Sequence, residues 1–253
     1  MAGLRVAASY NREMAGSIGI IACSAEGASL CYRTICAEGK EFFGPYAHPE
    51  VSLHSLSLAE YMRRIDGGDW PGVGEMMLES AQKLAQAGAD FLICPDNTIH
   101  QAMQYVVPRS PLPWLHIAEV VADAAIGRGF RRLGITGTRW LVASEVYPEK
   151  LTARGLDSLR PSDAEREEMH RIITDELVHG ISKPEAVAAF QRIIGRMKAE
   201  GCDAVILGCT EIPLLMNDAN SPLPVLDSTR LLARAALRRA VQAQTANAAG
   251  VTS

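Results

Sequence analysis

Two stretches of the chain each end an apolar run on a side chain that can hold and release a proton. In "GADFLICPDNTIH" the run ends at Asp96, and in "GCDAVILGCTEIP" it ends at Cys209. A carboxylate and a thiol can both serve as acid or base when their pKa values suit the task. Plainer interpretations exist, since Asp before Asn-Thr can cap a helix and a strand-end Cys is often structural. His100, one turn further on, is expected to pack in the core or lie at the surface.

The two stretches repeat one another. The glycine and the aspartate that open the first stretch align with Gly201 and Asp203 of the second, at the offset of 113 residues (209 − 96) that separates Asp96 from Cys209. Each copy contains an amphipathic helix, a glycine, an acidic residue, an apolar strand and then a polar turn. An internal repeat of this kind indicates two related α/β halves.

Strand-like and helix-like patterns alternate along the chain. The apolar runs with strand character are 17–23, 50–56, 90–95, 113–117, 132–138, 203–208 and 223–227. Helical periodicity is clear over 72–88 and 186–201, and both segments end at a glycine. This alternation predicts an α/β protein with two similar Rossmann-like domains and mostly parallel sheets.

The expected organisation places one cleft between two domains. We expect a leader over 1–16, a first domain over 17–115 plus 225–253 with a returning helix, and a second domain over 116–224. Ligands of open α/β sheets bind at the carboxyl ends of the strands, so Asp96 and Cys209 should face one cleft. Two acid/base groups on opposite faces of a carbon can invert it, one removing a proton and the other adding one. The polar turns beside them suit a substrate carboxylate.

Composition excludes several classes of protein. The chain has 253 residues, of which 48% are hydrophobic and 21% charged, which is typical of a packed globular core. A net charge of −4 argues against nucleic acid and anionic membranes as partners. There is no signal peptide, membrane-length run or zinc spacing, so we expect a cytoplasmic protein with six reduced cysteines. The lack of a GxGxxG motif or P-loop counts against a nucleotide enzyme.

Six segments together are distinctive. They are "GCTEIPLL" (208–215), "DNTIHQ" (96–101), "LGITGTRWLVASEVY" (133–147), "LDSTRLLARAA" (226–236), "HPEVSLHSLSLAEY" (48–61) and "YRTICAEG" (32–39). These segments resemble the aspartate/glutamate racemase family of cofactor-independent amino-acid racemases. The resemblance covers the chain from about residue 17 to about residue 241. It implies two α/β domains with the site between them, a small amino-acid or related carboxylic-acid substrate, no pyridoxal phosphate, no metal and a homodimer.

The same resemblance assigns roles to individual residues. The family's usual catalytic pair is two cysteines; Cys209 matches the second, and Asp96 stands in place of the first. The substrate-binding positions that the resemblance implies are Asn97, Thr98, Thr210, Glu211, Ser55 and Thr138. The chain departs from the family pattern in the glycine-poor turn "ACSAEGA" (22–28) and at Leu141, where threonine is common. It also lacks an obvious basic residue beside "HSLSLAEY" to hold a side-chain carboxylate, so the substrate pocket is expected to differ.

Three functions remain open from the sequence. The main hypothesis is racemisation or epimerisation at the Cα of an aspartate- or glutamate-like amino acid, by proton transfer between Asp96 and Cys209. The first alternative is a cofactor-free decarboxylase or other isomerase with Cys209 as a one-sided proton donor. An ionised Asp96 argues against the decarboxylase, because it would repel the substrate carboxylate. The second is a non-catalytic protein that binds small acids.

Overall fold

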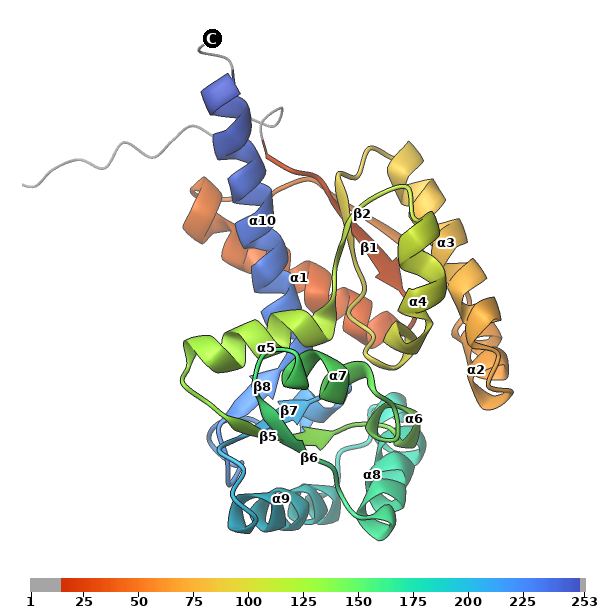
Figure 1. Cartoon of the computed structure of the whole chain (residues 1–253), viewed down its shortest axis with the longest axis vertical. Helices are drawn as coiled ribbons and strands as arrows, with labels where there is room; N and C mark the ends of the chain where they lie inside the picture. The colour runs from red at the N-terminus through yellow and green to blue at the C-terminus, as the bar shows by residue number, and fades with distance from the viewer. Residues whose placement is uncertain (1–14, 251–253) are drawn as a thin grey trace, which may run out of the picture.

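The chain folds around two separate parallel sheets. The computed structural model describes residues 15–250, with side chains described as far as residue 242, so the expected leader lies outside the described residues apart from its last two positions. The described residues form two four-stranded sheets, one in each half, in which every strand pair is parallel. Figure 1 shows the halves one above the other, each with its own helices. The predicted α/β class with two parallel sheets is confirmed.

The first sheet has the strand order β2-β1-β3-β4. Its strands are β1 (Ile18–Ala22), β2 (Val51–Ser55), β3 (Phe91–Ile93) and β4 (Trp114–Leu115). Its helices are α1 (Ala25–Phe43), α2 (Leu58–Asp66), α3 (Trp70–Gln86), the 3-10 turn η1 (Thr98–Ala102), α4 (Met103–Val106) and the turn η2 (Val107–Arg109). The pattern predicted over 72–88 forms most of α3, which Asp69 caps by accepting the N–H of Gly72.

The second sheet repeats this order as β6-β5-β7-β8. Its strands are β5 (Arg132–Thr136), β6 (Asp157–Leu159), β7 (Ala204–Leu207) and β8 (Val225–Asp227). Its helices and turns are α5 (Ile117–Gly127), α6 (Arg139–Val142), α7 (Val146–Thr152), α8 (Asp163–Asp175), η3 (Leu177–His179), α9 (Pro184–Ala199) and η4 (Ile212–Leu214). The last helix, α10 (Ser228–Gly250), follows β8.

The repeated sequence segments occupy equivalent places in the two sheets, since they lead into β3 and β7. Gly88 and Gly201 follow helices α3 and α9 with φ of +88° and +90°, a backbone region that favours glycine. Asp90 and Asp203 each accept a backbone N–H, at 2.7 Å in both halves, from the residue that precedes β1 or β5. Each aspartate therefore fixes the start of its own strand against the neighbouring strand.

The division drawn from the sequence needs a correction at residue 225. Strand β8 pairs with β7, so Val225–Asp227 belongs to the second sheet rather than to the first domain. Only α10 crosses back: Leu232, Ala236 and Leu237 pack with α1 against the first sheet, as the run of α10 beside α1 in Figure 1 shows. The physical reason is that β8 supplies the edge of the second sheet before the chain can leave it.

Two local predictions also differ from the structure. The strand predicted over 113–117 stops at Leu115, because the ring of His116 accepts the N–H of Ala118 and caps α5. The short strand β6 has no counterpart among the predicted runs. Its sequence, Asp-Ser-Leu, carries no apolar alternation, and it is extended because it pairs with β5.

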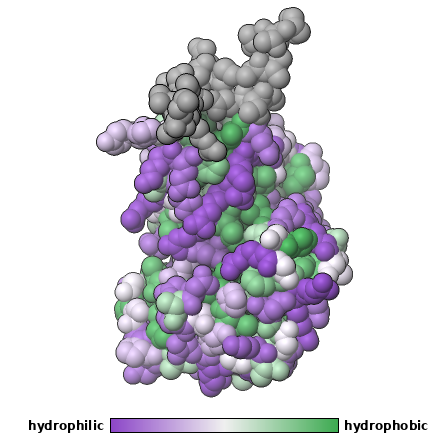
Figure 2. All heavy atoms as spheres, turned by 90° about the vertical axis from the view of Figure 1, so that its left-hand side faces the viewer, coloured by the Kyte–Doolittle hydropathy of each residue, from purple (hydrophilic) through white to green (hydrophobic). Residues whose placement is uncertain are grey.

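Alternate residues of the first sheet's central strands face different helices. Ile18 and Ile20 of β1 pack with α1 and α10, whereas Ile21 packs with α2, α3 and α4. The sheet is therefore covered on both faces, as a buried parallel sheet requires. Figure 2 shows hydrophilic and hydrophobic side chains interspersed over one side of the molecule. Among the described helices, none has both the length and the apolar character needed to cross a membrane.

Candidate active site

A cavity of about 390 Å³ lies where the carboxyl ends of the central strands of both halves meet. Asp96 enters it from the turn after β3, and Cys209 enters it from the turn after β7. The two side chains therefore reach one cavity from equivalent positions of the two halves. Gly208 makes the second turn possible, because a Cβ there would come within 2.5 Å of the carbonyl oxygen of Thr136.

The surroundings of Asp96 move the pKa of its carboxyl group towards neutral pH. Burial and the nearby charge of Glu211 raise its pKa to about 6, although the Cys23 thiol and the backbone N–H groups of Thr98 and Ile99 donate to the carboxylate and oppose that rise in pKa. A general base or acid works best with a pKa close to the working pH. The backbone contacts also mean that Asp96 caps the turn, so the capping role and a chemical role are compatible.

Cys209 is held by the carboxylate two residues later. Its Sγ donates to Oε2 of Glu211 at 2.8 Å, and Oγ1 of Thr210 donates to the same oxygen at 2.7 Å. Burial and the negative charge of Glu211 raise the pKa of the Cys209 thiol, whereas a hydrogen bond from the Glu211 backbone lowers it. The resting form is therefore the protonated thiol, hydrogen-bonded to the Glu211 carboxylate.

Replacing Glu211 with Gln is expected to make Cys209 more reactive towards iodoacetamide at pH 7 to 8. Removal of the neighbouring charge lowers the thiol pKa, and the thiolate is the reactive form. The measurement is the alkylation rate at Cys209, followed by peptide mass spectrometry. Glu26→Gln is the matched control, because Glu26 lines the same cavity but is not among the groups that shift the Cys209 pKa. An unchanged or slower rate in Glu211→Gln would contradict this electrostatic coupling.

Hydroxyl groups from the two halves meet at the cavity. Oγ1 of Thr98 and Oγ1 of Thr138 are 3.1 Å apart, and Oγ of Ser24 lies 3.5 Å from Oγ1 of Thr210. Ser24 also caps α1 by accepting the N–H of Gly27, whose missing Cβ would come within 2.4 Å of Thr210. The single glycine of the "ACSAEGA" turn is thus needed for close approach of the halves. The start of a long helix and these hydroxyls together suit an anionic group.

Two of the predicted binding residues, Asn97 and Ser55, direct their side-chain hydrogen bonds to other protein groups. Asn97 lines the cavity, but its Oδ1 accepts from the Tyr147 hydroxyl at 2.6 Å and its Nδ2 donates to Oγ of Ser228 at 3.0 Å. Its amide therefore braces the first turn against the second half. Ser55, at the exposed end of β2, is not among the residues that line the cavity and donates to the carbonyl of Leu56.

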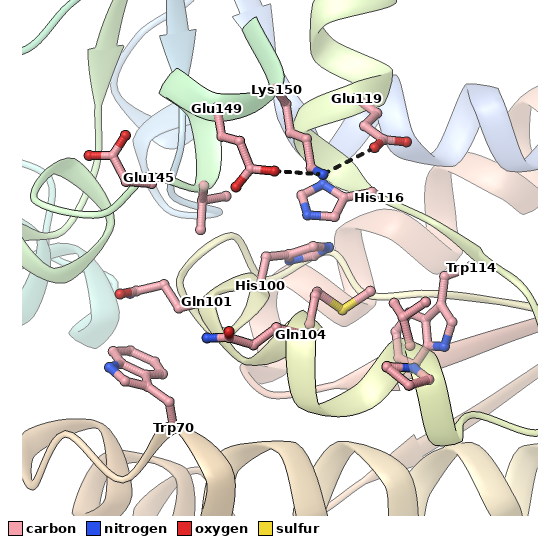
Figure 3. A pocket seen from close by; sticks show the side chains of 14 residues that line it. Trp70, His100, Gln101, Gln104, Trp114, His116, Glu119, Glu145, Glu149 and Lys150 are labelled. Carbon is pink, nitrogen blue, oxygen red and sulfur yellow. Dashed lines mark hydrogen bonds and ion pairs between the residues drawn. The ribbon is translucent and has the colours of Figure 1, made fainter. Parts of the chain in front are cut away.

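A larger cavity, of about 680 Å³, lies behind the first turn and is shown in Figure 3. His100 separates it from Asp96: its Nδ1 donates to the Asp96 carbonyl at 2.8 Å, and its Nε2 accepts the N–H of Ile117 at 3.4 Å. Burial lowers the pKa of His100 to about 4, so the neutral ring fits these two bonds and fixes the backbone of the turn. Lys150 at the top of the view pairs with Glu119 and Glu149, at 3.5 and 3.2 Å. Of the two expected places for His100, the core or the surface, the structure shows the core.

The sequence analysis missed several residues of the smaller cavity. Cys23 follows β1, and because Ile20 pairs with Ile93, it lies level with Asp96 on the neighbouring strand. In the sequence, a Cys at the end of an apolar strand resembles a core residue. The usable signal is that Cys23 and Asp96 each stand three residues beyond one member of the pair Ile20 and Ile93.

In the part of the chain that the structure describes, no three His, Cys, Asp or Glu side chains are grouped so that they could hold a metal ion.

Comparison with known proteins agrees with this architecture. Residues 18–236 match the Asp/Glu/hydantoin racemase family. The chain is 22% identical over 191 residues to the broad-specificity amino-acid racemase RacX of Bacillus subtilis, covering 74% of this chain and 80% of RacX.

Two solved structures are also similar. A candidate Asp/Glu racemase from Yersinia pestis superposes with a TM-score of 0.83 at 32% identity, covering 90% of this chain and all of that one. An aspartate racemase homologue from Pyrococcus horikoshii gives a TM-score of 0.77 at 30% identity, covering 88% and 98% of the two chains. With most of its length matched, the chain belongs to the Asp/Glu/hydantoin racemase family.

Proposed function

We propose that the protein is a cofactor-independent racemase or epimerase that inverts the Cα of an amino acid, with Asp96 and Cys209 serving its two faces. The observation that supports this most is their shared cavity: one proton-carrying side chain follows the equivalent central strand in each half. Family membership and the similarity to an amino-acid racemase support an amino acid as the substrate.

The pKa shifts of Asp96 and Cys209 indicate which of the two carries a proton before the substrate binds. With the pKa of Asp96 at about 6 and that of Cys209 raised, the resting pair at neutral pH is a carboxylate and a thiol. From this state Asp96 takes the Cα proton of one enantiomer, the carbanion is protonated on its other face by Cys209, and the thiolate that remains is next to Thr210 and Glu211. Conversion of the opposite enantiomer uses the protonated Asp96 and the thiolate, so the asymmetric pair runs the same steps in reverse.

Solvent deuterium exchange tests the proposal. We expect at least one amino acid in a panel of both enantiomers to exchange its Cα proton in D₂O while its optical rotation decays, as chiral chromatography and NMR would record. Loss of CO₂ from a malonate-type acid, with no exchange in any amino acid, would favour the one-sided decarboxylase instead. Neither reaction, combined with a rise in melting temperature when small acids are added, would favour a binding protein.

A further inference from the structure

Helices contribute an apolar wall to the active-site cavity. Leu58, Met62 and Ile65 of α2 line it at positions i, i+4 and i+7, which lie on one face of a helix. The second half adds apolar side chains from α6, α8 and η3. Together these six residues, here called the apolar wall, are Leu58, Met62, Ile65, Trp140, Ile173 and Val178.

Trp140 is held in place from two sides. The ring of His170 meets its indole edge to face, with centroids 4.6 Å apart, and Nε2 of Gln101 donates to the Trp140 carbonyl at 3.2 Å. Its position is thus set before a substrate binds, and a fixed apolar surface selects by shape and polarity more sharply than a mobile one.

The charged side chains that line the cavity are all acidic. They are Glu26, Asp96 and Glu211, and among the described residues that line it there is no Lys, Arg or His. Three arginines stand directly beside wall residues in the sequence, and none of them is among the residues that line the cavity. Arg64 pairs with Asp69 at 2.6 Å, Arg139 pairs with Glu167 at 3.9 Å, and Arg63 is exposed on α2.

We propose that the substrate is an amino acid with an uncharged, apolar side chain, which packs on the apolar wall, and that aspartate and glutamate are poor substrates. This rests on the racemase activity proposed above and names its substrate class. A substrate with an acidic side chain would bring a second carboxylate into a cavity that already holds three and offers no cation, so that charge would be desolvated without a partner. Burial of an apolar side chain against the wall is favourable.

The test compares side chains on the unmodified protein. Racemisation is measured for Leu, Met, Phe, Asp, Glu and Lys at equal concentrations, with Cα exchange recorded in parallel. We expect kcat/KM for the best apolar amino acid to exceed that for Asp or Glu by about tenfold or more, the scale on which pocket contacts discriminate. A preference for Asp, Glu or Lys would overturn the inference while leaving the proposed racemase activity intact. Exchange in none of the six would instead count against the racemase activity itself.

Variants of α2 connect the selectivity to the wall. Met62→Arg and Leu58→Arg place a guanidinium on the wall, and each is expected to lower kcat/KM for apolar amino acids and raise it for Asp and Glu. Leu58 is 37% exposed, so an arginine there can be accommodated without burying its charge. Arg63→Met is the matched control, because Arg63 is exposed on the same helix and does not line the cavity. An unchanged preference in both arginine variants, with melting temperatures near that of the wild type, would contradict the role of the wall.

Discussion

Cys209→Ser is expected to lower the rate of racemisation by about three orders of magnitude, within the range that a positioned acid or base contributes. Serine keeps the hydrogen-bond donor that Glu211 accepts at 2.8 Å and nearly keeps the volume of the side chain. Its hydroxyl is far less acidic than a thiol, so it cannot serve as the proton donor and return as the base. The measurement is chiral chromatography of product formed from each pure enantiomer.

The more discriminating measurement on Cys209→Ser is solvent exchange. The enantiomer whose Cα–H faces Asp96 should still exchange in D₂O with its configuration kept, whereas the other enantiomer should not exchange. Cys36→Ser is the matched control, because Cys36 is a partly exposed cysteine of α1 outside the cavity, and this variant should match the wild type. Racemisation at the wild-type rate in Cys209→Ser would show that the thiol is not one of the two acid/base groups.

That Asp96 and Cys209 share one cavity could be predicted from the sequence, because each lies in a local motif. Asp96 and Cys209 directly follow apolar strands. Residues that follow parallel strands all emerge at the carboxyl edge of the sheet, where ligands bind. Thr98, Thr138 and Thr210 reach the cavity for the same reason. These positions depend on the strands being parallel, which the alternation of strands and helices already indicates.

The apolar wall of the cavity could not be predicted from the sequence, because it depends on how helices of the two halves pack together. The pattern "LAEYMRRID" shows that α2 has an apolar stripe, with Tyr61 and Ile65 buried. It does not show that Leu58 and Met62, beside that stripe, complete the cavity wall, because this requires the position of α6 and α8 from the other half. Ser55 shows the converse: it ends the edge strand β2, but its side chain is exposed and is not among those that line the cavity, which the chain after β2 first reaches at Leu58 of α2.

Short and polar elements were missed for a related reason. β6 contains Asp157 and Ser158 and becomes a strand only through its pairing with β5. Cys23 resembles a core residue in sequence, and its contact with Asp96 follows from the register of β1 on β3. Both depend on long-range pairing, which local propensity cannot report.

Asp96→Asn is expected to abolish racemisation while leaving the turn folded, since the amide keeps an oxygen that can accept a backbone N–H of the cap. Exchange should then persist only for the enantiomer whose Cα–H faces Cys209, the mirror of the result for Cys209→Ser. Asp96→Cys is the matched variant, because it restores an ionisable group, and it should exchange both enantiomers. Full racemisation in Asp96→Asn would mean that Asp96 only caps the turn.

The raised pKa of Asp96 also predicts how activity and stability depend on pH. The wild-type kcat/KM should rise as pH increases through about 6, because Asp96 must lose its proton to act as the base. A carboxyl whose folded-state pKa lies above its unfolded value, 3.8, binds its proton more tightly in the folded protein, so its ionisation lowers stability as pH rises from about 4 to about 6. The asparagine variant lacks this loss, and its melting temperature relative to the wild type should therefore be higher at pH 7 than at pH 4. A difference in melting temperature that does not change with pH would show that the folded protein leaves the pKa of Asp96 unaltered.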